Sequence, residues 1–236
     1  MTPPWYRGRL AAFDMETTGV DPCEARIVTA AVGVVGGGAT PSWRSLLVDP
    51  GIEIPAEASA IHGVTTERAR AEGTPAMEAV ATLAEELADI WHDGMPVVIF
   101  NATYDLTVMR SELRRHGLPP LVVGPVIDPL VLDRGCDRYR KGSRKLDAMC
   151  AHYGAKLDQA HDAASDALAA ARVAYVLAQR YPRVAYASLD ELQDMQRRWA
   201  AEWHTALEAR KRQSDPAAVV ARGWPMQDEA GPTEVT

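Results

Sequence analysis

The stretch LAAFDMETTG, residues 10–19, is an apolar run that ends in two carboxylates. Successive side chains of a strand point to opposite faces, so Asp14 and Glu16 share one face of the strand expected here. Their like charges repel each other, which disfavours ionisation of both groups. A cation between the two carboxylates would remove this repulsion. A solvated strand end is the alternative explanation of the pair.

A further acid follows the apolar run VVIFN, residues 97–101. Asn101 ends the expected strand, and Asp105 lies just inside the helix expected after it. Taken alone, Asp105 is explained by the favourable interaction of an acid with the positive end of a helix dipole. Its position after a strand end also makes it a candidate member of a site.

The last acid stands at the start of an alanine-rich helix, in HDAASDALAAA, residues 161–171. Asp166 shares a helical row with alanine, valine and leucine residues, so it should face the core. A buried acid needs a partner or a metal. His161 taken alone is better explained by a structural role. Asp162 is interpreted as the N-cap of the helix and stays outside the site.

The four acids carry more information as a set than singly. Each lies at a strand end or a helix start, where α/β proteins gather their ligand sites. Carboxylate oxygens are hard ligands that suit Mg²⁺ or Mn²⁺. The sequence therefore predicts a divalent-metal site formed by Asp14, Glu16, Asp105 and Asp166.

The elements that must position these acids form an α/β pattern. The strands are expected at residues 8–16, 25–35, 41–50 and 95–101, with a short one at the start of 124–133. The helices are expected at residues 74–92, 103–117, 143–154 and 162–181. Three strands with short links, followed by alternating helices and strands, predict a mixed five-stranded sheet flanked by helices.

An amphipathic C-terminal helix is expected over residues 188–213. Its apolar stripe consists of Leu189, Leu192, Trp199, Trp203 and Leu207. The stripe should pack on its own domain or on a second copy of the chain, so an oligomer stays open. The polar segment that follows, 214–236, is expected to be a disordered tail.

Composition limits the classes of protein to which the chain can belong. With 236 residues, 47% of them hydrophobic, it is long enough for one domain with an appendage. A net charge of -7 gives no global basic field, so any nucleic-acid site must be local. The three cysteines fit neither a zinc site nor a redox pair. No signal-like N-terminus or apolar run of ~20 residues is present, so we expect a cytoplasmic protein with no membrane partner.

Four motifs together resemble the DEDDh, or DnaQ-like, 3′–5′ exonucleases, with the epsilon proofreading subunit of bacterial replicative DNA polymerase as a near likeness. These motifs are FDMETTG, NATYDLTVM, SRKLDAMCAHYG and HDAASD. The stretch IHGVT, residues 61–65, matches a further segment of the family. The resemblance covers residues 8–181 and implies an RNase H-like fold. It makes residues 1–182 the exonuclease domain and 183–213 a helical extension.

The resemblance also implies the role of each site residue. Asp14, Glu16, Asp105 and Asp166 would hold two Mg²⁺ ions, which Mn²⁺ could replace, and Asp14 would bridge them. His161 would be the general base that takes a proton from the attacking water. The products would be nucleoside 5′-monophosphates released from DNA 3′ ends.

Other residues are candidates for holding a single-stranded or frayed 3′ end. The candidate substrate contacts are Thr17, Thr18, Ile61, His62 and Asn101. For the 61–62 pair, a turn with a packed isoleucine is an equally good explanation. The segment RGCDRYRKGSRK, residues 134–145, is a basic loop with an interleaved tyrosine, which suits a single-stranded tail. An ordinary solvated loop is its alternative.

Two departures from the family pattern favour a stand-alone enzyme. Phe100 stands where some proofreading subunits have histidine, and no clear clamp-binding peptide supports association with a polymerase or clamp. An exoribonuclease or oligoribonuclease with the same chemistry is the alternative within this class, because the pocket around the 2′-OH decides between DNA and RNA. A non-catalytic nucleic-acid-binding module is the alternative outside it.

Overall fold

Six strands form one mixed sheet at the centre of the computed structural model, which describes residues 4–38 and 40–229. The strands are Arg9–Thr17 (β1), Ile27–Gly36 (β2), Ser42–Asp49 (β3), Thr74–Pro75 (β4), Val97–Val98 (β5) and Val126–Ile127 (β6). Their spatial order is β4-β3-β2-β1-β5-β6. The pairs β1–β2 and β2–β3 are antiparallel, whereas β3–β4, β1–β5 and β5–β6 are parallel. The predicted mixed α/β architecture is confirmed.

The sheet has one strand more than expected because residues 74–75 are extended. They pair with Val48 and Asp49 at the edge of the sheet, and the helix begins only at Ala76. Proline disfavours the helical conformation of the residue before it, which keeps Thr74 extended. The helix expected from residue 74 therefore starts later, with Pro75 at its N-cap position.

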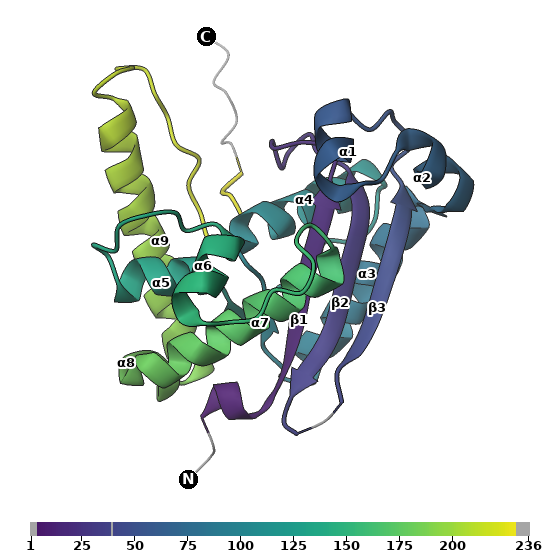
Figure 1. Ribbon diagram of the computed structural model, residues 1–236. Helices are drawn as coiled ribbons and strands as arrows, with labels where there is room; N and C mark the ends of the chain where they lie inside the picture. The colour runs from purple at the N-terminus through teal and green to yellow at the C-terminus, as the bar shows by residue number, and fades with distance from the viewer. Residues whose placement is uncertain (1–3, 39, 230–236) are drawn as a thin grey trace.

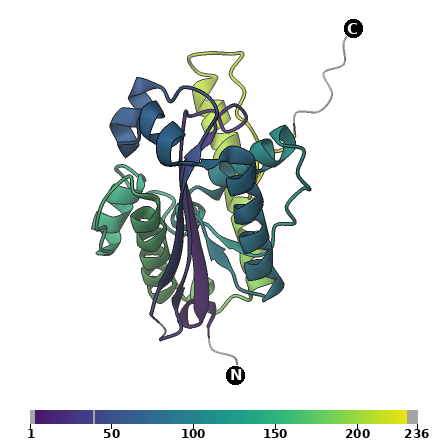
Figure 2. The same cartoon turned by 90° about the vertical axis from the view of Figure 1, so that its right-hand side faces the viewer.

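Helices cover both faces of the sheet. The helices are Trp5–Arg7 (η1, 3-10), Ala56–His62 (α1), Thr66–Glu72 (α2), Ala76–His92 (α3), Ala102–Arg115 (α4), Pro129–Cys136 (α5), Leu146–Tyr153 (α6), Ala163–Arg180 (α7), Pro182–Ala185 (α8) and Leu189–Lys211 (α9). Seen edge-on, α6 and α7 lie on one side of the sheet and α3 lies on the other (Figure 2). The helices α1 and α2 cover the end of the sheet at which β1 ends (Figure 1). Among the described helices, none combines the length and apolarity that crossing a membrane requires.

The alternation of β1 decides which face carries the acids. Ala11 and Phe13 belong to the hydrophobic cluster under α3 and α4. Leu10 and Ala12 belong to the opposite cluster, which is built mainly on α7. Asp14 follows the second set, so the acidic pair emerges toward α7.

Several described helices have no counterpart in the sequence prediction, namely η1, α1, α2, α5 and α8. The helices α1 and α2 have seven residues each, too short to give a clear periodic pattern. The segment 129–136 was expected as part of a strand and a loop, but it is α5. Asp128 caps this helix, and Pro129 occupies its first turn, which is a local helix-start signal.

The C-terminal helix α9 packs against α5 and β6 of its own chain. Its start is fixed by a capping box between Ser188 and Glu191. Leu192 is buried in the α7 cluster. A Cβ added at Gly135 would lie 2.0 Å from Trp199, so glycine permits the close approach of α5 to α9. The apolar stripe therefore has its partner within the chain, while the domain division at residue 182 stays a prediction.

Part of the expected tail packs on the domain. Residues 214–229 return from α9 toward the sheet, and Trp224 is only 7% exposed, within the α3–α4 cluster. Its indole Nε1 donates to Asp128, and the Gln227 main-chain N–H donates to Thr107. The prediction of disorder is wrong for this part, because the indole of Trp224 packs in the hydrophobic core and holds the polar segment around it in place. Residues 230–236 lie outside the described residues.

Candidate active site

Asp14 and Glu16 stand at the end of β1, where the strand emerges from the core. Burial, followed by repulsion from Asp105 and Asp166, raises the pKa of Asp14 well above its usual value. Burial raises the pKa of Glu16 to about 7, although His161 acts in the opposite direction. The predicted mutual repulsion of the pair is therefore part of a larger repulsion among several acids.

Asp105 comes from the first turn of α4 and is 4% exposed. Burial raises its pKa well above the usual value, and a hydrogen bond from the Met15 main chain opposes the shift. The start of α4 depends on Asn101, which adopts a left-handed conformation with φ of 61°. A non-glycine residue rarely adopts this conformation without support from its surroundings.

That support comes from Asp128, a residue that the sequence reasoning missed. Its carboxylate accepts the main-chain N–H groups of Asn101 at 3.1 Å and Ala102 at 3.0 Å. It also accepts those of Leu130 and Val131 at the start of α5. Asp128 thus fixes two helix starts at once, and one of them carries Asp105. The aspartate–proline pair at 128–129 signalled a helix cap, but nothing local signalled the link to α4.

Asp166 enters from the start of α7, whose N-cap is Asp162, as predicted. Its Oδ2 accepts the main-chain N–H of His161 at 3.1 Å. Its Oδ1 is buried and has no hydrogen-bond partner among the described residues. Burial raises the pKa of Asp166, and the His161 N–H opposes this. A buried carboxylate oxygen that accepts no hydrogen bond is unfavourable unless a cation binds it, as a metal ion would.

His161 completes the group, in a left-handed conformation with φ of 63°. Its side chain is 57% exposed, and Nδ1 lies 3.9 Å from Glu16 Oε1. One ligand atom from each of Glu16, His161 and Asp166 lies within 4.8 Å of the others. The structure thus brings together all four acids and the histidine, from three separate segments of the chain.

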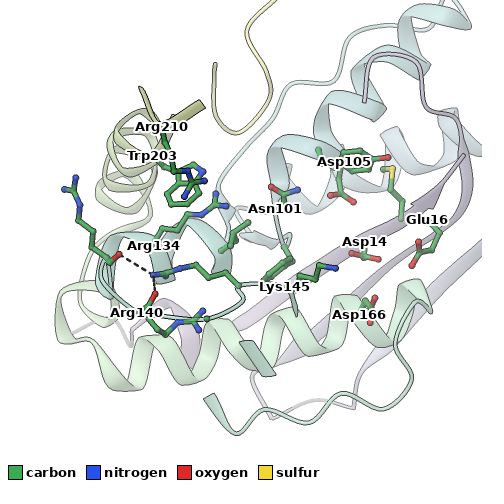
Figure 3. A pocket seen from close by; sticks show the side chains of 17 residues that line it. Asp14, Glu16, Asn101, Asp105, Arg134, Arg140, Lys145, Asp166, Trp203 and Arg210 are labelled. Carbon is green, nitrogen blue, oxygen red and sulfur yellow. Dashed lines mark hydrogen bonds between the residues drawn. The ribbon is translucent and has the colours of Figure 1, made fainter. Parts of the chain in front are cut away.

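The acids face a cavity of about 780 Å³, which is lined on its other side by basic residues. In Figure 3, Asp14, Glu16, Asp105 and Asp166 surround one space, with Asn101 and Lys145 beside it. The basic lining consists of Arg134, Arg138, Arg140, Arg144, Lys145 and Arg210. Because each acid raises the cost of ionising its neighbours, the donor set fits one or more divalent cations.

A family model described as Exonuclease matches residues 11–174. This chain belongs to that exonuclease family. The resemblance to the DnaQ-like 3′–5′ exonucleases is thereby confirmed. The match ends within α7, so α9 and the segment after it lie outside the matched region.

This chain spans less than half the length of the similar proteins described next. The DNA polymerase III PolC-type of Pediococcus pentosaceus is 25% identical over 205 residues, which cover 86% of this chain and 13% of that protein. The crystal structure of E. coli exonuclease I in complex with a dA16 oligonucleotide has a TM-score of 0.65 at 21% identity. A zinc-bound form of an E. coli exonuclease I–single-stranded DNA complex has a TM-score of 0.64 at 21% identity. Each of these two matches covers 75% of this chain and 42% of the other.

Of the predicted substrate contacts, Asn101 lines the cavity. The hydroxyls of the candidates at the end of β1 are used within the protein. Thr18 Oγ1 accepts the Arg26 main-chain N–H, and Thr17 Oγ1 donates to the Gly19 carbonyl. Tyr104, which the sequence reasoning missed, also lines the cavity and bonds to Thr17 through its hydroxyl.

Ile61 and His62 end α1, beside the site rather than in the cavity lining that the structure describes. Ile61 is 56% exposed, so the alternative of a turn with a packed isoleucine is wrong. His62 lies close enough to Thr17 and His161 for both to affect its pKa, which burial lowers. The two residues therefore remain candidates for contacts at the rim of the site.

Proposed function

We propose that this chain is a metal-dependent 3′–5′ exonuclease that releases nucleoside 5′-monophosphates from DNA 3′ ends. The observation that carries the proposal is the convergence of Asp14, Glu16, Asp105 and Asp166 on one cavity wall, with raised pKa values that a cation would lower. His161 beside them supports a hydrolytic site over a site that only binds. Three free cysteines are compatible with work in the cytoplasm.

The acids would hold the metal in a defined arrangement. Asp14 is central, because its pKa is raised first by burial and then by each of Asp105, Asp166 and Glu16. Glu16 and Asp166 would hold one Mg²⁺ on the His161 side, and Asp105 would support a second ion from α4. Bound divalent ions supply a nucleophilic water at neutral pH and stabilise charge on the phosphate.

His161 would act as the general base. Its Nδ1 faces Glu16, so Nε2 is the ring atom free to accept the proton of the attacking water. The oxygen of that water bonds to phosphorus as the bond from phosphorus to the 3′ oxygen of the preceding nucleotide breaks. The high exposure of His161 lets it pass the proton on to solvent.

The substrate proposal is single-stranded DNA or a frayed 3′ end. Exonuclease I of similar fold has been crystallised with DNA oligonucleotides, and PolC-type relatives are DNA polymerases by name. We place the terminal nucleotide between the acids, Asn101 and the rim residues Ile61 and His62, with the Thr17–Thr18 main chain behind it. The absence of a clear clamp-binding peptide in the sequence supports a stand-alone enzyme.

Incubation with 5′-labelled oligonucleotides tests the proposal. DNA and RNA of one sequence, single- and double-stranded, should be compared with Mg²⁺, Mn²⁺ or EDTA. A ladder that shortens from the 3′ end of DNA, with mononucleotide product and no reaction in EDTA, supports the assignment. Faster degradation of RNA would favour the exoribonuclease alternative. Binding without cleavage under every metal condition would favour the non-catalytic module.

A further inference from the structure

The basic lining of the cavity contains two kinds of arginine. Arg140 and Arg144 both bind the buried carboxylate of Asp133, and Arg140 does so through two nitrogens at 3.2 Å. Tyr153 donates its hydroxyl to the same carboxylate at 2.6 Å. These two arginines therefore tie the basic loop to α5, and their charge is partly neutralised within the protein.

Arg134 belongs to the other kind. Its guanidinium lies over the indole of Trp203, with Cζ 4.0 Å from the ring centroid. Its Nε is buried without a hydrogen-bond partner, and no carboxylate of the described residues lies within ion-pair distance. Burial lowers its pKa to about 10, so it stays charged at neutral pH. A partly desolvated guanidinium with unused donors is incomplete without an anion.

The position of Arg134 indicates which anion. It lines the same cavity as the four acids, together with Lys145 and with Arg210 of α9. In Figure 3, Lys145 extends toward Asp14, while Arg134, Trp203 and Arg210 lie on the far side of Asn101 from the acids. The cations thus form one row that leads away from the acids, rather than a second metal-binding group.

We propose that Arg134, Lys145 and Arg210 bind the backbone phosphates of the nucleotides that precede the scissile bond, and that Trp203 holds Arg134 in place. This inference rests on the proposed exonuclease function. A guanidinium presents a planar set of donors that matches a phosphate, and its stacking on an indole reduces the entropy lost on binding. A single row of cations suits one strand, and contacts to phosphates alone are independent of sequence.

The inference gives the C-terminal helix a function. Arg210 and Trp203 both lie on α9, outside the region matched by the family model. Gly135, which admits Trp199 at close range, directly follows Arg134 in α5. The same close helix contact that stabilises the extension therefore brings Arg134 and Trp203 together.

Binding of a fluorescein-labelled oligo-dT in Ca²⁺, measured by anisotropy over a range of NaCl concentrations, tests the upstream site. Arg134→Ala and Arg210→Ala should each weaken binding about tenfold at moderate salt. Each should also lower the slope of log Kd against log[NaCl] by about 0.7, the share of one phosphate contact in single-stranded nucleic acid. Arg198→Ala, an exposed arginine on the same helix that does not line the cavity, is the matched control and should match wild type.

A catalytic ratio separates this inference from the proposed function. The value of kcat/KM for the same oligo-dT is divided by that for the p-nitrophenyl ester of thymidine 5′-monophosphate, which has no upstream phosphates. Arg134→Ala should lower the ratio about tenfold, and Trp203→Leu should lower it more than Trp203→Phe, which keeps an aromatic ring. A wild type that hydrolyses neither substrate refutes the proposed function. The binding assay would still test whether Arg134 and Arg210 bind phosphates. If the variants bind weakly with an unchanged salt slope, the substitutions perturb the fold. The proposal that these cations bind backbone phosphates would then be wrong.

Discussion

The indole Nε1 of Trp224 donates a hydrogen bond to Oδ2 of Asp128 at 3.3 Å, although 96 positions separate the two residues. The same carboxylate holds the main-chain N–H groups at the start of α4, the helix that carries Asp105. The C-terminal segment is therefore linked through one buried acid to a residue of the candidate metal site. Burial raises the pKa of Asp128, and four main-chain and indole donors oppose the shift.

We expect Asp128→Asn to destabilise the fold by about 2–4 kcal/mol, since an amide nitrogen would then face N–H donors that need an acceptor. Trp224→Phe keeps an aromatic ring in place and removes one hydrogen bond, so its cost should be about 1 kcal/mol. Urea denaturation of both variants measures the difference. Equal losses of stability would show that Asp128 does not organise α4 and α5 as described.

The repulsion among the four acids predicts a trade-off between stability and function, in which neutral variants are more stable but inactive. Asp14→Asn and Asp166→Asn should abolish nuclease activity and weaken Mn²⁺ binding, as measured by calorimetry. In EDTA the same variants should melt at a higher temperature than wild type, because each removes one charge from a group of mutually repelling carboxylates. Glu85→Gln, at an exposed position of α3, serves as the control and should change neither property. A lower melting temperature for both site variants in EDTA would contradict the repulsion inferred here.

The pKa of Glu16 predicts how the metal-free protein responds to pH. Its folded-state pKa is about 7, above the ordinary value of 4.5, so folding favours the protonated form. The contribution of Glu16 to the free energy of unfolding is fully present below about pH 4.5. It is lost as the pH rises through 7, by up to about 3 kcal/mol. Wild type in EDTA should therefore lose stability between about pH 5 and pH 8, and Glu16→Gln should lose less.

Added Mg²⁺ should reverse this dependence, because the cation and the proton compete for the same carboxylates. Chemical denaturation at several pH values, with and without Mg²⁺, measures both effects. Parallel plots of unfolding free energy against pH for Glu16→Gln and wild type in EDTA would show that Glu16 is ionised even without a cation. The inferred repulsion among buried carboxylates would then be wrong.

The sequence predicted those features whose signals lie in short stretches. The alternation of β1 placed Asp14 and Glu16 on one face, and the periodicity of the alanine-rich helix placed Asp166 toward the core, where the structure has them. The mixed sheet followed from the spacing of apolar runs. Each of these inferences needed only residues within one element and the geometry of a strand or helix.

The missed features depend on contacts between distant segments. Asp128 supports α4 from another element, and Trp224 fills a site that the sheet and α4 create. Nothing in the sequence near Arg134 indicates that Trp203 will stack on it, 69 positions away along the chain. The segment 134–145 was predicted as one basic loop with an interleaved tyrosine. Its division into arginines bound to Asp133 and an arginine without a carboxylate partner is a property of the folded chain.

The structure sharpens the test of His161 as general base. Its backbone is left-handed, with φ of 63°, so alanine at this position would strain the loop as well as remove the imidazole. Asparagine and glycine tolerate this conformation and are the better replacements. The main-chain N–H that bonds to Asp166 is kept in both variants. We therefore expect His161→Asn and His161→Gly to bind Mn²⁺ nearly as wild type does, while their cleavage rates fall by roughly 10²–10⁴.

Chemical rescue distinguishes a base from a structural residue. His161→Gly leaves a space at the exposed edge of the site, next to Glu16, that imidazole from solution can enter. Added imidazole should raise the cleavage rate of this variant and have little effect on Asp14→Asn, which lacks a metal ligand rather than a base. A purely structural role would give no rescue. If both His161 variants lose Mn²⁺ binding as completely as Asp14→Asn, then His161 is a ligand, consistent with its ring nitrogen lying within 4.8 Å of Glu16 and Asp166 oxygens, and another group must accept the proton.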